Sequence, residues 1–269
     1  MSVRYIDAHC HLQFDQYADD GDSLVSAMEA QGVAGIVVGC DLESSKRAIA
    51  LAEKHEHLFA SVGLHPNHEP DEQYDTGIYH ALARHPKVVA IGECGLDFFR
   101  PQEVTPELKE KQKELLQKQV ELAAEIRKPL IIHSRPSKGT ADAYEGLIEI
   151  LSGAKKKHSD LQGDIHFFVG GVAEAQALSA LGFTLSFTAV ITFARDYDEV
   201  IRSIPIESLL AETDAPYVAP EGRRGKRNDP LAIIDVVEKI AVIRDEDPEY
   251  VRAALLANTR ELFSLPKGL

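Results

Sequence analysis

Short apolar runs alternate with longer segments of helical periodicity along most of the chain. Each apolar run has five or six residues, the length of a buried strand. The clearest helical segment is Glu107–Arg127, in which Leu108, Leu115 and Leu122 recur every seven residues on one face. Thr105 supplies a candidate N-cap hydroxyl in front of it. The eight runs that we interpret as strands are VRYIDA, GIVVG, LFASVG, VVAIGE, PLIIH, DIHFF, FTLSF and LLAET.

This alternation predicts an α/β protein built on a parallel sheet. Eight is the number of strands that closes a (β/α)8 TIM barrel, so we expect a barrel. Shorter helices are predicted at Ser23–Gln31 and Ser45–Lys54, and an additional helix at Pro248–Leu265. No composition shift, long linker or internal repeat marks a boundary, and a single domain over residues 1–269 is therefore predicted.

Composition and charge limit the kinds of molecule that the protein can be expected to bind. Hydrophobic residues make up 44% of the chain, enough for a large core, whereas 29 basic against 43 acidic residues leave a net charge of −14. An acidic surface repels nucleic acid, so such a partner requires a local basic patch. The three cysteines argue against a disulfide framework. With no signal-like start and no apolar stretch of about 18 residues, we expect a cytoplasmic protein with no membrane and no obligate protein partner.

The first apolar run ends in side chains that bind metals. Asp7, His9 and His11 stand at alternate positions, which places them on one face of a strand. Buried imidazoles and carboxylates are costly unless something pairs with them, and a metal ion would do so. In that case Asp7 orients the two histidines from behind. Strand alternation turns Cys10 and Cys94 the other way, and we interpret both as small buried hydrophobic residues.

Other predicted strands end in residues of the same kind. Because the carboxyl ends of parallel barrel strands meet at one rim, these side chains are expected to converge. A single histidine is more often an ordinary polar residue than a ligand, but several histidines and carboxylates on one rim favour a metal site. The further candidates are His65, Glu93, His133, Arg135, His166, Glu212 and Asp214.

The segments around these residues resemble the TatD-type metal-dependent deoxyribonucleases of the amidohydrolase superfamily. The stretches that carry the resemblance are YIDAHCHL, VGLHP, IGECGLDFFR, PLIIHSR, LAETDAPY and the later RNDP, in the expected order over nearly the whole chain. The resemblance implies a TIM barrel of the metallo-dependent hydrolase type and a metal-dependent phosphodiester hydrolase. It further implies a deoxyribonuclease, expected to be a 3′–5′ exonuclease, acting on DNA that is single-stranded or has free ends.

The resemblance also implies two divalent metal ions. Imidazole and carboxylate ligands suit Zn, Mn, Co, Fe or Ni, and carboxylate sharing also admits Mg. One departure concerns the sixth strand, where the family pattern HCFSG is replaced by HFFVGG, so that Val169 takes a polar position in a loop expected to contact substrate. The implied ligands are His9, His11 and Asp214 for one ion, His133 and His166 for the other, and Glu93 as the bridge.

The implied mechanism is attack on phosphorus by a hydroxide held between the two ions. The catalytic residues would be Asp214, which orients the water and accepts its proton, the bridging Glu93, and His65, which contacts a phosphate or assists the leaving oxygen. Arg135 would hold a phosphate, and Glu212 would contact a sugar or a base edge.

The segment EGRRGKRNDP supplies the local basic patch that an acidic nuclease requires. Arg223, Arg224, Lys226 and Arg227 place four positive charges within five residues, shortly after Asp214. We therefore expect this basic loop to contact the phosphates of the substrate.

Three alternatives remain open at this stage. A hydrolase of small-molecule esters, amides or phosphotriesters would share the metal chemistry but would not need the basic loop. A D-aminoacyl-tRNA deacylase would release an amino acid from tRNA and no nucleotide from DNA. A non-catalytic nucleic-acid-binding protein would bind DNA without metal and without turnover.

Overall fold

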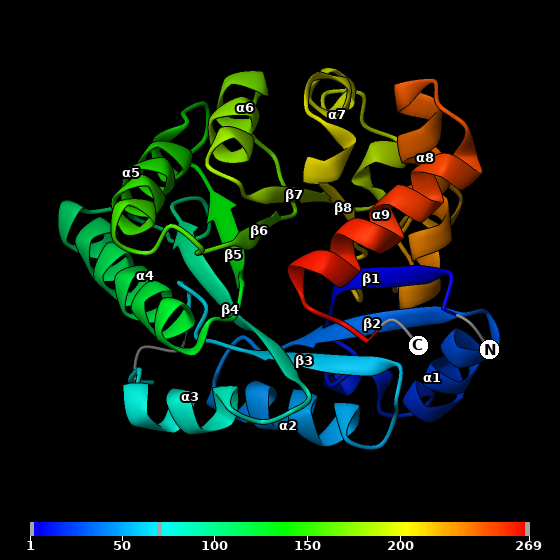
Figure 1. Ribbon diagram of the computed structural model, residues 1–269, viewed down its shortest axis with the longest axis horizontal. Coiled ribbons are helices and arrows are strands. Elements are labelled where there is room, and N and C mark those ends of the chain that lie inside the picture. The colour runs from blue at the N-terminus through cyan, green and yellow to red at the C-terminus, as the bar shows by residue number, and fades with distance from the viewer. Residues whose placement is uncertain (1–2, 69–71, 267–269) are drawn as a thin grey trace.

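The computed structural model describes residues 3–68 and 72–266 of the chain. Eight parallel strands form one sheet in chain order, and helices surround it (Figure 1). The predicted alternation and the TIM barrel are therefore confirmed, whereas a single domain over residues 1–269 stays a prediction. The strands are β1 (Tyr5–Cys10), β2 (Val33–Val38), β3 (Leu58–Val62), β4 (Val88–Asp97), β5 (Leu130–Arg135), β6 (Gly163–His166), β7 (Thr184–Phe187) and β8 (Leu209–Ala211).

The barrel closes where the ends of β1 and β8 meet. The amide of Asp214 donates to the carbonyl of His9 at 2.9 Å, just beyond the end of β8. The carboxylate of Asp7 accepts from the amide of Thr213 at 2.9 Å and from its hydroxyl at 2.5 Å. Closure therefore brings His9 and His11, from the start of the chain, next to Asp214, from near its end.

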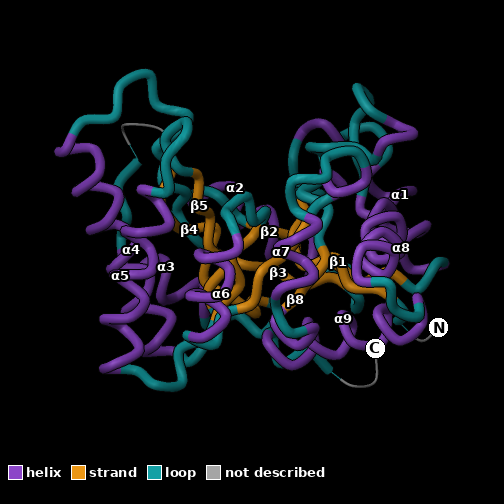
Figure 2. The backbone as a smooth tube through the Cα atoms, turned by 90° about the horizontal axis from the view of Figure 1, so that it is seen from above, coloured by secondary structure: helices purple, strands orange, loops and turns teal. Residues whose placement is uncertain are grey.

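The helices lie outside the strands, and loops extend beyond the strands along one edge of the molecule (Figure 2). No helix in the described part of the chain is long and apolar enough to cross a membrane. The helices are α1 (Gly21–Ala30), α2 (Leu42–Ala52), α3 (Thr76–Ala83), α4 (Pro106–Ile126), α5 (Asp142–Lys157), α6 (Val172–Ala180), α7 (Asp198–Ser203), α8 (Ile233–Arg244) and α9 (Pro248–Leu262).

Capping residues explain where the helices begin. The hydroxyl of Thr105 accepts from the amide of Leu108 at 3.2 Å, so α4 begins one residue before the predicted start. α2 begins at Leu42 instead of the predicted Ser45, because Asp41 accepts from the amide of Ser44 at 2.6 Å and so caps the helix earlier.

The two ends of the barrel interior differ in polarity. Residues that follow α9 pack with apolar side chains of the strands, in a cluster that contains Ile6, Ile36, Phe59, Ile131, Leu210, Leu262 and Phe263. Near the carboxyl ends of β6, β7 and β8 the buried side chains are polar. The hydroxyl oxygen of Ser186 lies 2.5 Å from a carboxylate oxygen of Asp164 and 2.8 Å from one of Glu212, within hydrogen-bond distance of both. Burial and the nearby Glu212 raise the pKa of Asp164 to about 7.

Candidate metal centre

Glu93 lies between two pairs of histidines. Its Oε1 atom is 3.1 Å from Nδ1 of His133 and 2.9 Å from Nε2 of His166. Its Oε2 atom faces the other pair, at 3.7 Å from Nε2 of His9 and 4.0 Å from Nε2 of His11. Within the two pairs the facing ring nitrogens are 3.1 and 3.2 Å apart. One buried carboxylate thus presents one oxygen to each histidine pair, as a carboxylate shared by two cations does.

Glycines on both sides of Glu93 allow β4 to approach β5 this closely. Gly92 and Gly95 have φ values of 148° and 146°, a region that glycine adopts readily and other residues rarely. A Cβ atom at Gly92 would clash with the backbone of Ile131, and one at Gly95 with the backbone of His133. The sequence GECG therefore sets the position of Glu93 beside His133.

Asp214 lies against the pair formed by His9 and His11. Its Oδ1 atom is 3.4 Å from Nε2 of His11 and 3.8 Å from Nε2 of His9. Its backbone φ is 50°, a left-handed value that aspartate tolerates better than most residues. Its side chain is 11% exposed, against 6% for Glu93, so Asp214 is the more accessible of the two carboxylates.

Two half-sites result from this arrangement. The first half-site consists of His9, His11 and Asp214, and the second of His133 and His166, while Glu93 serves both. Ligand atoms of His9, His11 and Glu93 all lie within 4.8 Å of one another, and so do those of Glu93, His133 and His166. The structure therefore brings together the six residues that the sequence proposed as ligands.

The outer nitrogens of three histidines are bonded to acceptors. Nε2 of His133 is 3.0 Å from a carboxylate oxygen of Asp97, and Nδ1 of His11 is 2.9 Å from the carbonyl oxygen of Val38. Nδ1 of His166 is 3.4 Å from a carboxylate oxygen of Glu212. Each acceptor requires a proton on the outer nitrogen, so in a neutral ring the inner nitrogen carries a lone pair.

These lone pairs point at the oxygens of Glu93 and Asp214, and at one another. Lone pairs and anionic oxygens 2.9–4.0 Å apart repel unless a proton or a cation lies between them. The donor set of neutral imidazoles and carboxylates suits divalent transition metals, and the outer hydrogen bonds are those that orient metal-binding histidines. The residues present therefore fit a metal centre.

The charges of the cluster shift the pKa values of its members. Burial, together with the nearby His166, lowers the pKa of His9 well below its ordinary value. Burial opposes ionisation of Glu93, but the nearby His166 outweighs it and holds the pKa of that carboxyl well below its usual range. Burial also disfavours a charged His166, yet Glu93 and Glu212 raise its pKa well above the ordinary value. Without a cation this site holds a proton on His166, which metal binding would release.

His65 borders the second half-site. Its Nε2 atom is 3.4 Å from Oε1 of Glu93 and 3.4 Å from a guanidinium nitrogen of Arg100. Burial lowers the pKa of His65 to about 3, so that the ring is neutral at physiological pH.

The sequence did not single out Asp97, Arg100 or Cys40 as part of the site. Asp97 accepts from His133 and from the amides of Phe99 and Arg100, the last two at 2.9 and 3.0 Å. The sequence could have indicated Asp97, because it stands four residues after Glu93 on one strand, and this spacing places both side chains on the same face. The thiol of Cys40 donates to Oε2 of Glu93 at 3.3 Å, just after the end of β2.

The structure corrects the role predicted for Asp7 and confirms the burial predicted for Cys10 and Cys94. Asp7 accepts from the backbone amide of His9 at 3.2 Å and holds β1 to β8, so it acts on the backbone and not on the imidazole. Cys10 and Cys94 are fully buried in the layer between strands and helices.

A cavity of about 470 Å³ opens over the cluster. His65 and Arg135 line it, as expected for residues that contact substrate. Glu212, expected to contact the substrate as well, is fully buried and accepts from the amide of Phe167 and the hydroxyl of Ser186. Its carboxylate therefore supports His166 and does not line the cavity.

The basic loop does not line this cavity either. Arg223 forms ion pairs with Asp229 and Asp235, at 2.8 and 3.5 Å, and Arg227 pairs with Asp20 at 2.5 Å. Arg224 lies over the ring of Phe193, 4.3 Å from its centroid, and Lys226 makes no ion pair with the residues that the structure describes. Two of the four positive charges are therefore neutralised within the chain.

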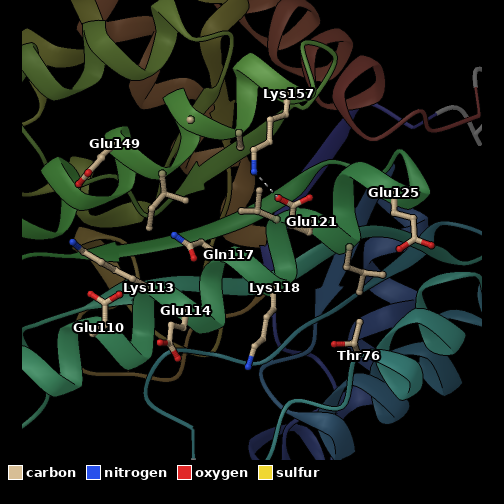
Figure 3. Close-up of a pocket in the computed structure, with 15 residues that line it drawn as sticks. Thr76, Glu110, Lys113, Glu114, Gln117, Lys118, Glu121, Glu125, Glu149 and Lys157 are labelled. Carbon is tan, nitrogen blue, oxygen red and sulfur yellow. Dashed lines mark ion pairs between the residues drawn. The ribbon is translucent and has the colours of Figure 1, made fainter.

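A larger cavity of about 830 Å³ lies away from the cluster, on the outer face of α4 and α5 (Figure 3). Acidic and basic side chains of the two helices line it, among them Glu121 and Lys157, which pair at 3.6 Å. No histidine lines it among the described residues. The larger cavity thus lacks the ligand chemistry of the smaller one.

An eight-stranded parallel barrel with histidines and carboxylates gathered at the carboxyl ends of its strands fits the class of metal-dependent hydrolases. The family model for TatD-related DNases matches residues 6–264, and the chain belongs to this family. The family resemblance seen in the sequence is thereby confirmed.

Relatives cover almost all of the chain. The uncharacterized metal-dependent hydrolase YabD of Bacillus subtilis is 35% identical over 96% of this chain and 98% of its own length. The 3′-5′ ssDNA/RNA exonuclease TatD of Salmonella typhimurium is 34% identical over 96% of this chain and 98% of its own length. The crystal structure of YjjV, a TatD homologue from Escherichia coli, superposes with a TM-score of 0.87 at 31% identity, covering 99% of this chain and 100% of the other.

Proposed function

We propose that this metal-dependent hydrolase is an exonuclease that removes nucleotides from the ends of single-stranded DNA, with 3′–5′ polarity. The observation that carries the proposal is the position of Glu93, whose two oxygens face two histidine pairs. One divalent ion would be held by His9, His11 and Asp214, a second by His133 and His166, and both by Glu93. Mg, Mn, Zn, Co, Fe and Ni are all candidates for this donor set.

When bound, such ions polarise phosphoryl oxygens and lower the pKa of a bound water. The residues of the chain supply the rest of the chemistry. Asp214, the more accessible carboxylate, orients the attacking water and accepts its proton on a side-chain oxygen. Arg135 and Arg100 line the cavity and hold the phosphate, and the neutral His65 beside Arg100 contacts the phosphate or the leaving oxygen.

The size of the cavity supports a single-stranded end as substrate. A volume of about 470 Å³ is in the range of sites for small ligands, so it accommodates one or two nucleotides but not a duplex. The Salmonella relative named as a 3′-5′ ssDNA/RNA exonuclease supports the same substrate class and polarity. In the basic loop, Arg224 and Lys226 are the residues we propose for phosphate contacts outside the cavity, because Arg223 and Arg227 are already paired. The free thiols of all three cysteines support a reducing, cytoplasmic location.

The test is release of nucleotides from single-stranded DNA labelled at the 3′ or the 5′ end. Protein stripped with a chelator is assayed before and after each of the six metals is added back. The proposal predicts metal-dependent release from the 3′ end. D-aminoacyl-tRNA and a phosphotriester are tested in parallel, and turnover of either one without release from DNA would replace the nuclease with the corresponding hydrolase. DNA binding without metal and without turnover would indicate a non-catalytic protein.

Asp97→Asn should weaken metal binding by about 10-fold or more, in the range found when such supporting partners are removed. The variant removes the anionic acceptor that fixes the proton of His133 on its outer nitrogen. The readout is the metal dissociation constant, measured by competition with a chelating dye, and turnover should recover at high metal concentration. Asp160→Asn, the same change at an exposed site, is the control. Equal metal affinity in Asp97→Asn and wild type would show that Asp97 does not support metal binding by His133.

A further inference from the structure

Aromatic side chains border the cavity over the metal centre, although the surface exposes few aromatic residues. Among the described residues, the large hydrophobic side chains that are exposed include three aromatic ones, Phe99, Tyr217 and Tyr250. Tyr217 is 48% exposed and lines the cavity, and Phe99, 51% exposed, precedes the cavity-lining Arg100. Folding does not require such exposure, because an exposed ring contributes little to the core.

One group of aromatic rings lies beside the first half-site. Phe14, which follows β1, is stacked on the ring of His11, with centroids 4.6 Å apart and planes inclined by 8°. Tyr217, which follows β8, meets the same imidazole edge-on at 6.2 Å. Both rings line the cavity. We call Phe14 and Tyr217 the first rim.

A second group lies beside the second half-site. Phe167 directly follows His166, in the HFFVGG segment that departs from the family pattern, and lines the cavity. Its φ is 46°, and its amide is held by the buried carboxylate of Glu212. The guanidinium of Arg135 lies 5.0 Å from the ring centroid of Phe99 and 6.0 Å from that of Phe167. We call Phe99, Arg135 and Phe167 the second rim.

Strand order places the two rims on opposite sides of the barrel mouth. The first rim follows β1 and β8, which meet at the closure, and the second follows β4, β5 and β6 on the far side of the ring of strands. The metal centre lies between them, because Glu93 shares one oxygen with each half-site. A phosphodiester bound at the centre would therefore have an aromatic surface on both sides.

We propose that the two rims stack the unpaired bases on either side of the scissile phosphodiester, one base on each rim. This inference rests on the proposed function and deepens it, since it names a single strand with two unstacked terminal bases as the substrate. Every base has a flat apolar face, and both aromatic rings and the arginine plane stack on such faces without reading the sequence. A duplex end would have to lose its last base pair before both rims are filled.

The experiment uses the metal-loaded full chain and four short oligothymidylates. One is unmodified, one lacks the base on one side of the terminal phosphodiester, one lacks the base on the other side, and one lacks both. The missing bases are replaced by tetrahydrofuran, which keeps the sugar-phosphate backbone. Each oligonucleotide is cleaved by the wild type, by Phe99→Ala, by Tyr217→Ala and by the control Tyr250→Ala, an exposed aromatic residue on α9 far along the chain from either rim.

Removing either base should lower kcat/KM of the wild type by about 5- to 150-fold, the factor that roughly 1–3 kcal/mol of stacking per base produces. Phe99→Ala and Tyr217→Ala should lose a comparable factor on the unmodified strand, mainly through KM. Removing the base that stacks on the altered rim should then have no further effect on that variant, whereas removing the other base should still lower its kcat/KM. The base without effect should differ between the two variants. Tyr250→Ala should match the wild type throughout.

Two results would overturn the inference while leaving the nuclease intact. One is efficient cleavage of the doubly abasic strand by the wild type. The other is a variant that remains as sensitive to both base removals as the wild type, which would make the exposed rings mere surface or a contact for another protein. If the wild type cleaves none of the four strands with any metal, the proposed function fails and the inference fails with it.

Discussion

Glu93→Gln should lower kcat/KM for metal-dependent cleavage by about 10³-fold or more, equivalent to about 4 kcal/mol of transition-state stabilisation. The glutamine side chain has the same shape but one neutral oxygen and no negative charge. Because Oε1 and Oε2 of Glu93 face different half-sites, this single change weakens both of them. We expect a larger loss here than at any ligand that belongs to one half-site.

Glu149→Gln is the matched control, since it makes the same chemical change in the cavity on the outer face of α4 and α5. It should leave both activity and metal content unchanged. Thermal unfolding of the two variants without metal separates loss of function from loss of fold. A Glu93→Gln protein that retains activity within tenfold of the wild type would contradict the shared role of this carboxylate.

Asp214→Asn should lower kcat by about 10²- to 10⁴-fold, the contribution typical of a general base. The amide cannot accept the proton of the attacking water, although it keeps the size of the carboxylate. Asp214 lies closest to the first half-site, 3.4 Å from Nε2 of His11 and 3.8 Å from Nε2 of His9, so metal binding to the second half-site should persist. Substrate binding should be largely retained, and the effect should appear in kcat more than in KM.

The measurement is single-turnover cleavage of labelled single-stranded DNA, together with the metal content of the variant. Loss of the chemical step with at least one ion retained supports proton acceptance by Asp214. Full activity would end this role, whereas loss of both ions would assign Asp214 to metal binding alone.

The fold was predictable because its signal is local. Each buried strand is a short apolar run, and each helix shows its own periodicity, so the order of elements follows directly from the sequence. The predicted first residues of the helices were less accurate, because the capping side chain sets where a helix begins and the apolar periodicity does not show it. For this reason α2, which Asp41 caps, begins at Leu42, three residues before the predicted Ser45. β8, with only three residues, ends before Glu212 and Asp214, which the sequence had placed at the end of a longer strand.

Those features of the candidate site that depend only on where a residue stands along a strand were predictable from the sequence. The carboxyl ends of parallel strands meet, so His9, His133 and Asp214 had to be neighbours whatever their rotamers. What the sequence does not contain is the direction of each side chain. The division of the two Glu93 oxygens between the half-sites depends on the approach of β4 to β5, and the burial of Glu212 depends on a hydrogen bond from Phe167.

Charges offer the clearest example of this limit. The basic loop looks like a patch of four free cations in the sequence, but Asp20, more than two hundred residues away in the chain, neutralises Arg227. Asp229 and Asp235 do the same for Arg223. The partner of a charged side chain, whether near or far along the chain, depends on the folded structure and cannot be read from local composition.

The shared metal centre can be tested without any substrate, by the number of ions bound per chain, counted by elemental analysis after equilibrium dialysis against each candidate metal. We expect about two ions per chain for the wild type with at least one of the six metals, and fewer than two for Glu93→Gln under the same conditions. A wild type that binds no ion with any of them would contradict the metal centre. Two ions retained in full by Glu93→Gln would contradict the carboxylate bridge on which the proposed mechanism depends.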